Sequence, residues 1–108
     1  MARTNGAVDP PSLEALFHRE MVRICQRSRD EAGYHPGLLL RLVTEKGGLA
    51  TAQQLLRSPL VSDGFTALWE RGRVDLTAEA LVLRPEFRVL FTEEELAAAR
   101  SRLNAASS

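Results

Sequence analysis

His18, Cys25 and His35 have side chains of the types that support nucleophilic catalysis or bind a metal ion. His18 and Cys25 are seven residues apart, which puts them on one side of an α-helix but about 10.5 Å apart along its axis. A thiolate–imidazole pair needs hydrogen-bond contact, so this spacing does not predict a nucleophile. The sequence has neither C-x-x-C nor H-E-x-x-H, and it has no glycine-rich phosphate loop. We expect no catalytic residue, no metal site and no cofactor.

Arginines form the most regular charged pattern in the sequence. Arg19, Arg23 and Arg27 recur every four residues, which predicts a stripe along one helix face that is able to meet phosphate groups. Nearby carboxylates reduce the net positive charge of this face, so a solvated face with local ion pairs is the preferred interpretation. Arg73 and Asp75 lie two apart in a tight loop, where they either pair with each other or offer a contact point. The candidate interaction surface comprises Arg19, Arg23, Arg27, Arg73 and Asp75.

Glu20 is the polar residue with the most unusual predicted position. Helical phase places it between Leu16 and Ile24, inside the apolar sector of its helix. A buried carboxylate must be paired or protonated, because an unpaired buried charge is very costly. We expect a partly buried ion pair, and the alternative is a carboxylate lining a groove. The candidate partners are Arg23, Arg27, Arg41 and Arg73.

The elements that position these residues are predicted to be helices. Apolar spacing predicts a first helix over about 11–32, capped by Asp9 or Ser12 and closed by Gly33. A second helix opens at Pro36 and, being apolar on most sides, is expected to be the central element. Gly47-Gly48 ends it, and Thr51 with Gln54 reads as the capping box of a short third helix.

Further capping signals divide the second half of the chain. Ser62 or Asp63 and then Thr77 are expected to cap helices, and Thr92 with Glu95 is the clearest capping box in the sequence. A helix-turn-helix is disfavoured, because Phe65, Leu68 and Trp69 would face the core and leave few polar groups to read bases. The prediction is an all-α fold, a compact bundle of five or six helices with short connections.

One domain accounts for the whole sequence. We expect a flexible N-terminal tail over residues 1–11, a single helical domain over 12–103 and a flexible C-terminus over 104–108. The predicted core residues are Leu16, Phe17, Met21, Ile24, Leu39, Leu42, Val43, Leu55, Phe65, Leu68, Trp69, Leu81, Leu90, Phe91 and Leu96.

Four segments together carry a resemblance to a known family. In amino-acid sequence and in order, these segments resemble a small bacterial all-helical domain of unknown function. They are residues 31–36, 47–52, 63–70 and 72–83. That domain occurs alone or appended to larger proteins, and the likeness covers about residues 16–103. The resemblance implies an adaptor or accessory role, in some contexts within restriction or defence systems, and it supplies no reaction, ligand or catalytic residue.

Composition narrows the classes of partner. The 108 residues include fourteen basic and fourteen acidic side chains, so no net charge recruits nucleic acid or anionic lipid. A single cysteine fits a reducing compartment, and no apolar run is long enough to span a membrane, so we expect a cytoplasmic protein. We expect a non-enzymatic protein-interaction or adaptor module whose partner is another protein or a second copy. The alternative is a nucleic-acid-associated accessory protein that uses the arginine stripe.

Overall fold

The computed structural model describes residues 11–107, and these residues form six α-helices, two short 3-10 turns and no strand. The all-α prediction is therefore confirmed. The helices are α1 (Leu13–Ala32), α2 (Gly37–Lys46), α3 (Gly48–Arg57), α4 (Asp63–Glu70), α5 (Ala78–Val82) and α6 (Glu93–Ser107). The turns are η1 (Val74–Leu76) and η2 (Arg88–Leu90). The tail predicted over 1–11 lies, except for Pro11, outside the described residues.

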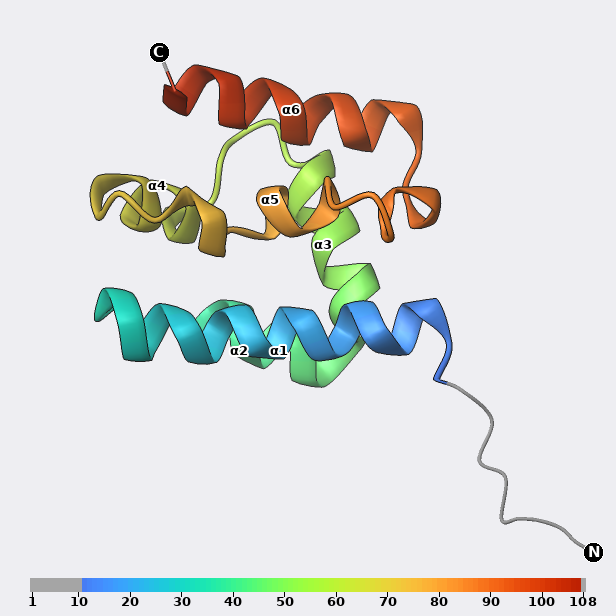
Figure 1. Cartoon of the computed structure of the whole chain (residues 1–108), viewed down its shortest axis with the longest axis horizontal. Coiled ribbons are helices and arrows are strands. Elements are labelled where there is room, and N and C mark those ends of the chain that lie inside the picture. The colour runs from blue at the N-terminus through green and yellow to red at the C-terminus, as the bar shows by residue number, and fades with distance from the viewer. Residues whose placement is uncertain (1–10, 108) are drawn as a thin grey trace, which may run out of the picture.

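The helices are stacked in three levels, as Figure 1 shows. Helices α1 and α2 form the lowest level of the view, α4 and α5 the middle and α6 the top. Helix α3 runs across the levels and packs against α1, α2 and α6, while α5 packs between α1 and α6. The short connections predicted from the sequence allow this stacking.

Side-chain caps start four of the described helices. The sequence analysis predicted two of these caps without an alternative and gave each of the other two as one of two candidates. The hydroxyl oxygens of Ser12, Ser62, Thr77 and Thr92 each accept a hydrogen bond from the backbone N–H three residues later. Glu95 completes the predicted capping box by accepting the Thr92 N–H at 2.9 Å. These bonds satisfy amides that have no partner inside their own helix, which is why local sequence marks the starts so well.

The core forms around α1. Phe17 is fully buried and meets the rings of Phe87 and Phe91 edge-on, with centroids 5.2 and 5.3 Å away. Met21 and Ile24 continue the buried face of α1 toward α3 and α5. Buried as predicted are Phe17, Met21, Ile24, Val43, Phe65, Leu68, Leu81, Phe91 and Leu96, whereas Leu39, Leu42, Leu55 and Leu90 are only partly buried. The sequence-based list missed Phe87, which lies in the turn before η2.

Two predicted core residues are wrong. Leu16 is 38% exposed and Trp69 is 50% exposed. The Trp69 ring keeps its indole Nε1–H outside the core, where the group donates to the backbone oxygen of Ala106 at 3.0 Å. This bond engages the last turn of α6, and the helix continues to Ser107 instead of ending at the predicted domain boundary of Leu103.

Helix α2 is not the central element, although the sequence predicted that the helix opening at Pro36 would be. Val43 is its only fully buried residue, and Leu38 and Leu40 are 63% and 41% exposed. Apolar residues on several sides of α2 therefore serve a surface rather than the core. Helix α3 takes the more central place, because it crosses the levels and packs against α1, α2, α5 and α6.

The predicted start of the third helix is also wrong. Helix α3 begins at Gly48, so Thr51 lies within the helix and forms no capping box with Gln54. Gly47 has φ +92°, a conformation that lets the chain reverse in a single residue. His18 then supplies the cap from α1, because its Nδ1 accepts the Gly48 N–H at 2.9 Å.

Candidate functional site

The predicted arginine stripe lies on α1, and two of its three members are paired with carboxylates. Arg23 Nε is 3.4 Å from Glu20, and Arg27 donates twice to Glu31, at 2.7 and 3.1 Å. Arg19 is exposed and forms no ion pair with residues 11–107. These pairs occupy the charges that a phosphate-binding stripe would need.

Arg73 and Asp75 form the predicted local pair and extend it to α1. Arg73 donates to both carboxylate oxygens of Asp75 at 3.0 Å and to Glu31 at 2.7 Å. Hydrogen bonds from Arg27 and Arg73 hold the pKa of Glu31 at about 2, and the Arg73 bond lowers the pKa of Asp75. The same bonds raise the pKa of both arginines. The structure thus joins three of the predicted candidates, Arg27, Arg73 and Asp75, into one network with Glu31, and that network fixes the end of α1 to η1.

Glu20 forms a partly buried ion pair, with a partner that the sequence did not suggest. Its carboxylate accepts from Arg84 at 3.0 Å and lies 3.4 Å from Arg23. Arg84 follows α5, so this pair ties α5 to α1 across 64 residues of sequence. Of the partners considered from the sequence, only Arg23 lies within ion-pair distance of Glu20, and Arg27 and Arg73 pair with Glu31 instead.

The histidines and the cysteine are separate from one another. His18 caps α3, Cys25 is buried in α1, and His35 is exposed in the α1–α2 connection. Burial raises the pKa of the Cys25 thiol to about 11. Across residues 11–107, no three His, Cys, Asp or Glu side chains are grouped closely enough to hold a metal ion. No described helix has the length and apolar character to cross a membrane.

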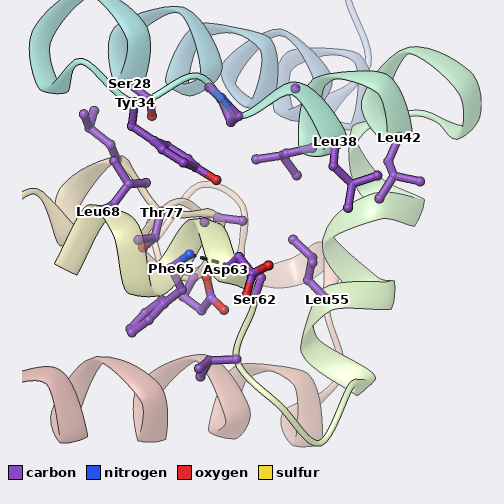
Figure 2. A pocket seen from close by; sticks show the side chains of 18 of the residues that line it. Ser28, Tyr34, Leu38, Leu42, Leu55, Ser62, Asp63, Phe65, Leu68 and Thr77 are labelled. Carbon is purple, nitrogen blue, oxygen red and sulfur yellow. Dashed lines mark hydrogen bonds between the residues drawn. The ribbon is translucent and has the colours of Figure 1, made fainter. Parts of the chain in front are cut away.

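A groove between α2, α3 and α4 is the main candidate site, and the sequence did not predict it. It encloses about 420 Å³. Figure 2 shows Leu38 and Leu42 reaching into it from α2, Leu55 from α3 and Leu68 from α4. Its volume falls in the range of small-ligand and side-chain pockets, and its walls are mainly apolar.

Exposed aliphatic side chains line the mouth of this groove. Leu38 is 63% exposed, Leu60 is 76% exposed and Val61 is 44% exposed, and all three line the groove. Leu60 and Val61 belong to the α3–α4 connection, and Leu38 belongs to α2. A cluster of exposed aliphatic residues beside a concavity is typical of an interaction site rather than of an ordinary surface.

Tyr34 places a polar group inside the groove. In Figure 2 its ring extends from the α1–α2 connection and its hydroxyl points toward the start of α4, where Ser62 and Asp63 lie. Arg71 holds the ring, with its guanidinium carbon 5.5 Å from the ring centroid. Arg71 is itself fixed by hydrogen bonds to the backbone oxygens of Ala32 and Ala67, at 3.2 and 3.0 Å. The phenol is therefore preorganised.

Gly64 lies beside that phenol. A Cβ atom at this position would lie 3.4 Å from the Tyr34 hydroxyl oxygen and 3.8 Å from Ser62 Oγ. The absent side chain leaves the first turn of α4 open to the groove. The Tyr34 hydroxyl forms no hydrogen bond with another residue in the described part of the chain, so it is available to a ligand.

The other polar groups of the groove differ in what they can offer. Ser62 Oγ already accepts the Phe65 N–H, and Glu79, 1% exposed, pairs with Arg102 at 3.1 Å. Asp63 is exposed, in the first turn of α4, and forms no ion pair within residues 11–107. No hydrogen bond joins His35 to another lining side chain within the same residues. The arrangement can bind an apolar group and orient it through Tyr34 and Asp63.

Two features of the sequence pointed to this site. Helix α2 has more apolar residues than one buried face requires, and Leu60-Val61 follow Pro59 in a loop where no helix face needs them. Both features are explained once α2 and the α3–α4 connection line a common groove. Tyr34 and Asp63 gave no such signal, because a turn tyrosine and an N-terminal aspartate are common in any helical protein.

No family model, curated protein or solved structure matches this chain. The resemblance to a small bacterial helical domain therefore stays a prediction.

Proposed function

We propose that this chain is a non-enzymatic protein-interaction module and that it binds an apolar segment of a partner protein in the groove between α2 and α4. The observation that carries the proposal is the exposed aliphatic mouth of the groove, formed by Leu38, Leu60 and Val61. Burying such side chains against a partner contributes favourable free energy, at about 25 cal/mol per Å² of apolar surface.

The shape of the site favours a different protein over a second copy. A two-fold dimer places the same patch against itself, and two concave patches do not fill each other. Val89 is 80% exposed on η2 and does not line the groove. Its insertion into a second molecule would make an open chain of copies rather than a closed dimer. A protruding segment of another protein fits the groove better.

The ion pairs of the arginine stripe disfavour the nucleic-acid alternative. Binding to phosphate backbones needs unpaired cations, and Arg23 and Arg27 already have carboxylate partners. That alternative predicts a mobility shift with duplex or single-stranded DNA that weakens steeply with salt. We expect no shift at low ionic strength.

Site-directed photo-crosslinking tests the proposed function. We would place p-benzoyl-phenylalanine at position 60 in the groove mouth and, as the matched control, at position 89, which is equally exposed. Position 60 should give a discrete adduct with another protein, and position 89 should not. Identical adduct patterns, or adducts only between copies of this chain, would contradict the proposal.

The crosslinked segment then needs a direct binding measurement. The adduct peptide would be mapped by mass spectrometry, synthesised with a fluorophore and titrated by anisotropy. Leu38→Asp should weaken its binding at least about tenfold, as expected for a central apolar contact. Val89→Asp, the control, should leave the Kd unchanged. A Kd insensitive to Leu38→Asp would place the peptide elsewhere.

A further inference from the structure

The charged groups facing the groove are unbalanced. Its lining residues include two carboxylates, Asp63 and Glu79, one histidine, His35, and no lysine or arginine. Glu79 is neutralised from behind by Arg102, which lies outside the lining. Asp63 has no cationic partner within the described residues 11–107. Among the lining side chains, the Asp63 carboxylate is therefore the one without an ion-pair partner in the described residues.

The position of Asp63 at the start of α4 does not cancel this charge. A helix N-terminus carries roughly half a positive charge, which stabilises the carboxylate but leaves about half of its charge uncompensated. Asp63 is also exposed, so it can reach a ligand without losing all of its solvent. An incoming cation therefore still meets residual negative charge at the Asp63 carboxylate.

Tyr34 adds a second acceptor beside Asp63. Its hydroxyl oxygen points toward the start of α4 in Figure 2 and can accept a hydrogen bond from an ammonium or guanidinium group. Arg71, the residue that follows α4, keeps the ring in place, so the phenol loses little freedom when a ligand binds. An oriented acceptor and a carboxylate thus face the same end of an apolar groove.

We infer that the partner segment carries a lysine or arginine next to its apolar side chains, and that Asp63 and Tyr34 bind this cationic group. The inference rests on the proposed function and deepens it by naming the chemistry of the partner. Leu38, Leu42 and Leu55 take the apolar part of the segment. The cation lies at the mouth, where it keeps part of its hydration.

Three small probes of similar shape test the charge preference without the partner. Phenylbutylamine, phenylbutanol and phenylbutanoate share an apolar body and differ in whether their end group is positive, neutral or negative at neutral pH. Binding would be followed by ¹H–¹⁵N chemical-shift titration of the full chain. The amine should bind about two- to fivefold more tightly than the alcohol, the range expected of an exposed ion pair, and the carboxylate most weakly.

Two matched variants assign the preference to Asp63. Asp63→Asn keeps a residue suited to a helix start and should make the amine and the alcohol bind equally. Glu70→Gln removes a carboxylate from the other end of α4, outside the groove lining, and should leave the preference unchanged. Thermal unfolding would show that both variants are folded.

The outcomes separate the inference from the proposed function. If all three probes shift groove amides with equal affinity, or the carboxylate binds best, the cation preference is wrong while the groove remains a binding site. A preference that persists in Asp63→Asn also overturns the inference. If no probe shifts the amides of Leu38, Leu42 or Leu55, the groove does not bind apolar groups, and the proposed function falls with it.

Discussion

His18 and Gly48 lie at a close contact between α1 and α3. The Nδ1 of His18 accepts the Gly48 N–H, which replaces the side-chain cap that a glycine cannot provide. A Cβ at position 48 would lie 2.8 Å from the His18 Cα and 3.2 Å from Met21 Cγ. Glycine is required here for close packing of two helices rather than for an unusual backbone angle.

Gly48→Ala should therefore destabilise the fold by about 1–3 kcal/mol, because the α1 backbone has to move to admit the methyl group. Urea unfolding followed by circular dichroism measures the change. Gly37→Ala is the matched control, since no atom lies within 4 Å of a Cβ at that position. The control should be neutral or slightly stabilising. Equal effects of the two substitutions would refute the packing argument.

Glu31 gives a pH-dependent contribution to stability. Its folded-state pKa of about 2 lies below the ordinary value of 4.5 because Arg27 and Arg73 bond to its carboxylate. A depressed pKa stabilises the folded state above pH 4.5, and this stabilisation is lost as the pH falls toward 2. The carboxylate binds a proton more readily in the unfolded chain, so acid shifts the equilibrium toward unfolding.

Glu31→Gln should lower the urea midpoint above pH 4.5, and the difference from the unaltered chain should shrink as the pH falls from 4.5 toward 2. The measurement is a series of urea unfolding curves across the acid range. Glu70→Gln serves as the control, because Glu70 forms no ion pair within residues 11–107. A difference for Glu31→Gln that stays constant with pH would contradict the assigned cause.

At the scale of elements, Arg102 joins three helices. Its guanidinium donates to the buried Glu79 of α5 and to the backbone oxygens of Leu55 and Ser58, at 2.9 and 2.6 Å. The last two acceptors lie at the end of α3, where helix carbonyls have no partner of their own. One side chain of α6 thus fixes α5 and caps α3, and it also keeps Glu79 neutralised at the groove.

Arg102→Leu should cost about 3–5 kcal/mol, because it leaves the Glu79 carboxylate buried without a partner. The double variant Glu79→Leu/Arg102→Leu should recover part of that loss, since both charges are then gone. Unfolding free energies of the single and double variants form a double-mutant cycle. Arg100→Leu, on the exposed side of α6, is the control and should be near neutral. Strictly additive effects would contradict the pairing.

At the scale of the whole molecule, the single tryptophan of the sequence, Trp69, lies where α4 meets α6. Trp69 is half exposed and donates to Ala106 near the end of the chain, and Figure 1 shows the end of α6 above α4. Its fluorescence therefore reports whether the last turn of α6 rests against α4. The sequence had assigned residues 104–108 to a flexible end, so this contact is a tertiary feature.

Deleting residues 104–108 should shift Trp69 emission to longer wavelength, because the indole loses its acceptor and gains water contact. The melting temperature should change little, since the ring is already half exposed. Deleting only residues 107–108 keeps Ala106 and should leave the emission unchanged. An unaltered spectrum in the longer deletion would show that α6 ends before reaching Trp69.

Local signals in the sequence were sufficient for the fold class and most element boundaries. The caps at Ser12, Ser62, Thr77 and Thr92, and the left-handed Gly33 after α1, depend on bonds within a few residues. Periodicity also identified the buried face of α1, because one continuous stripe of Phe17, Met21 and Ile24 leaves little choice of orientation.

Only the tertiary structure decided which apolar residues form the core and which line a surface. Leu38 and Trp69 resemble core residues in sequence, yet they are exposed because long-range neighbours determine burial, and spacing along one helix does not. The start of α3 depends on His18, thirty residues away, and the groove depends on four segments meeting. Glu20 likewise required a partner, and only the packing of α5 against α1 showed that it is Arg84.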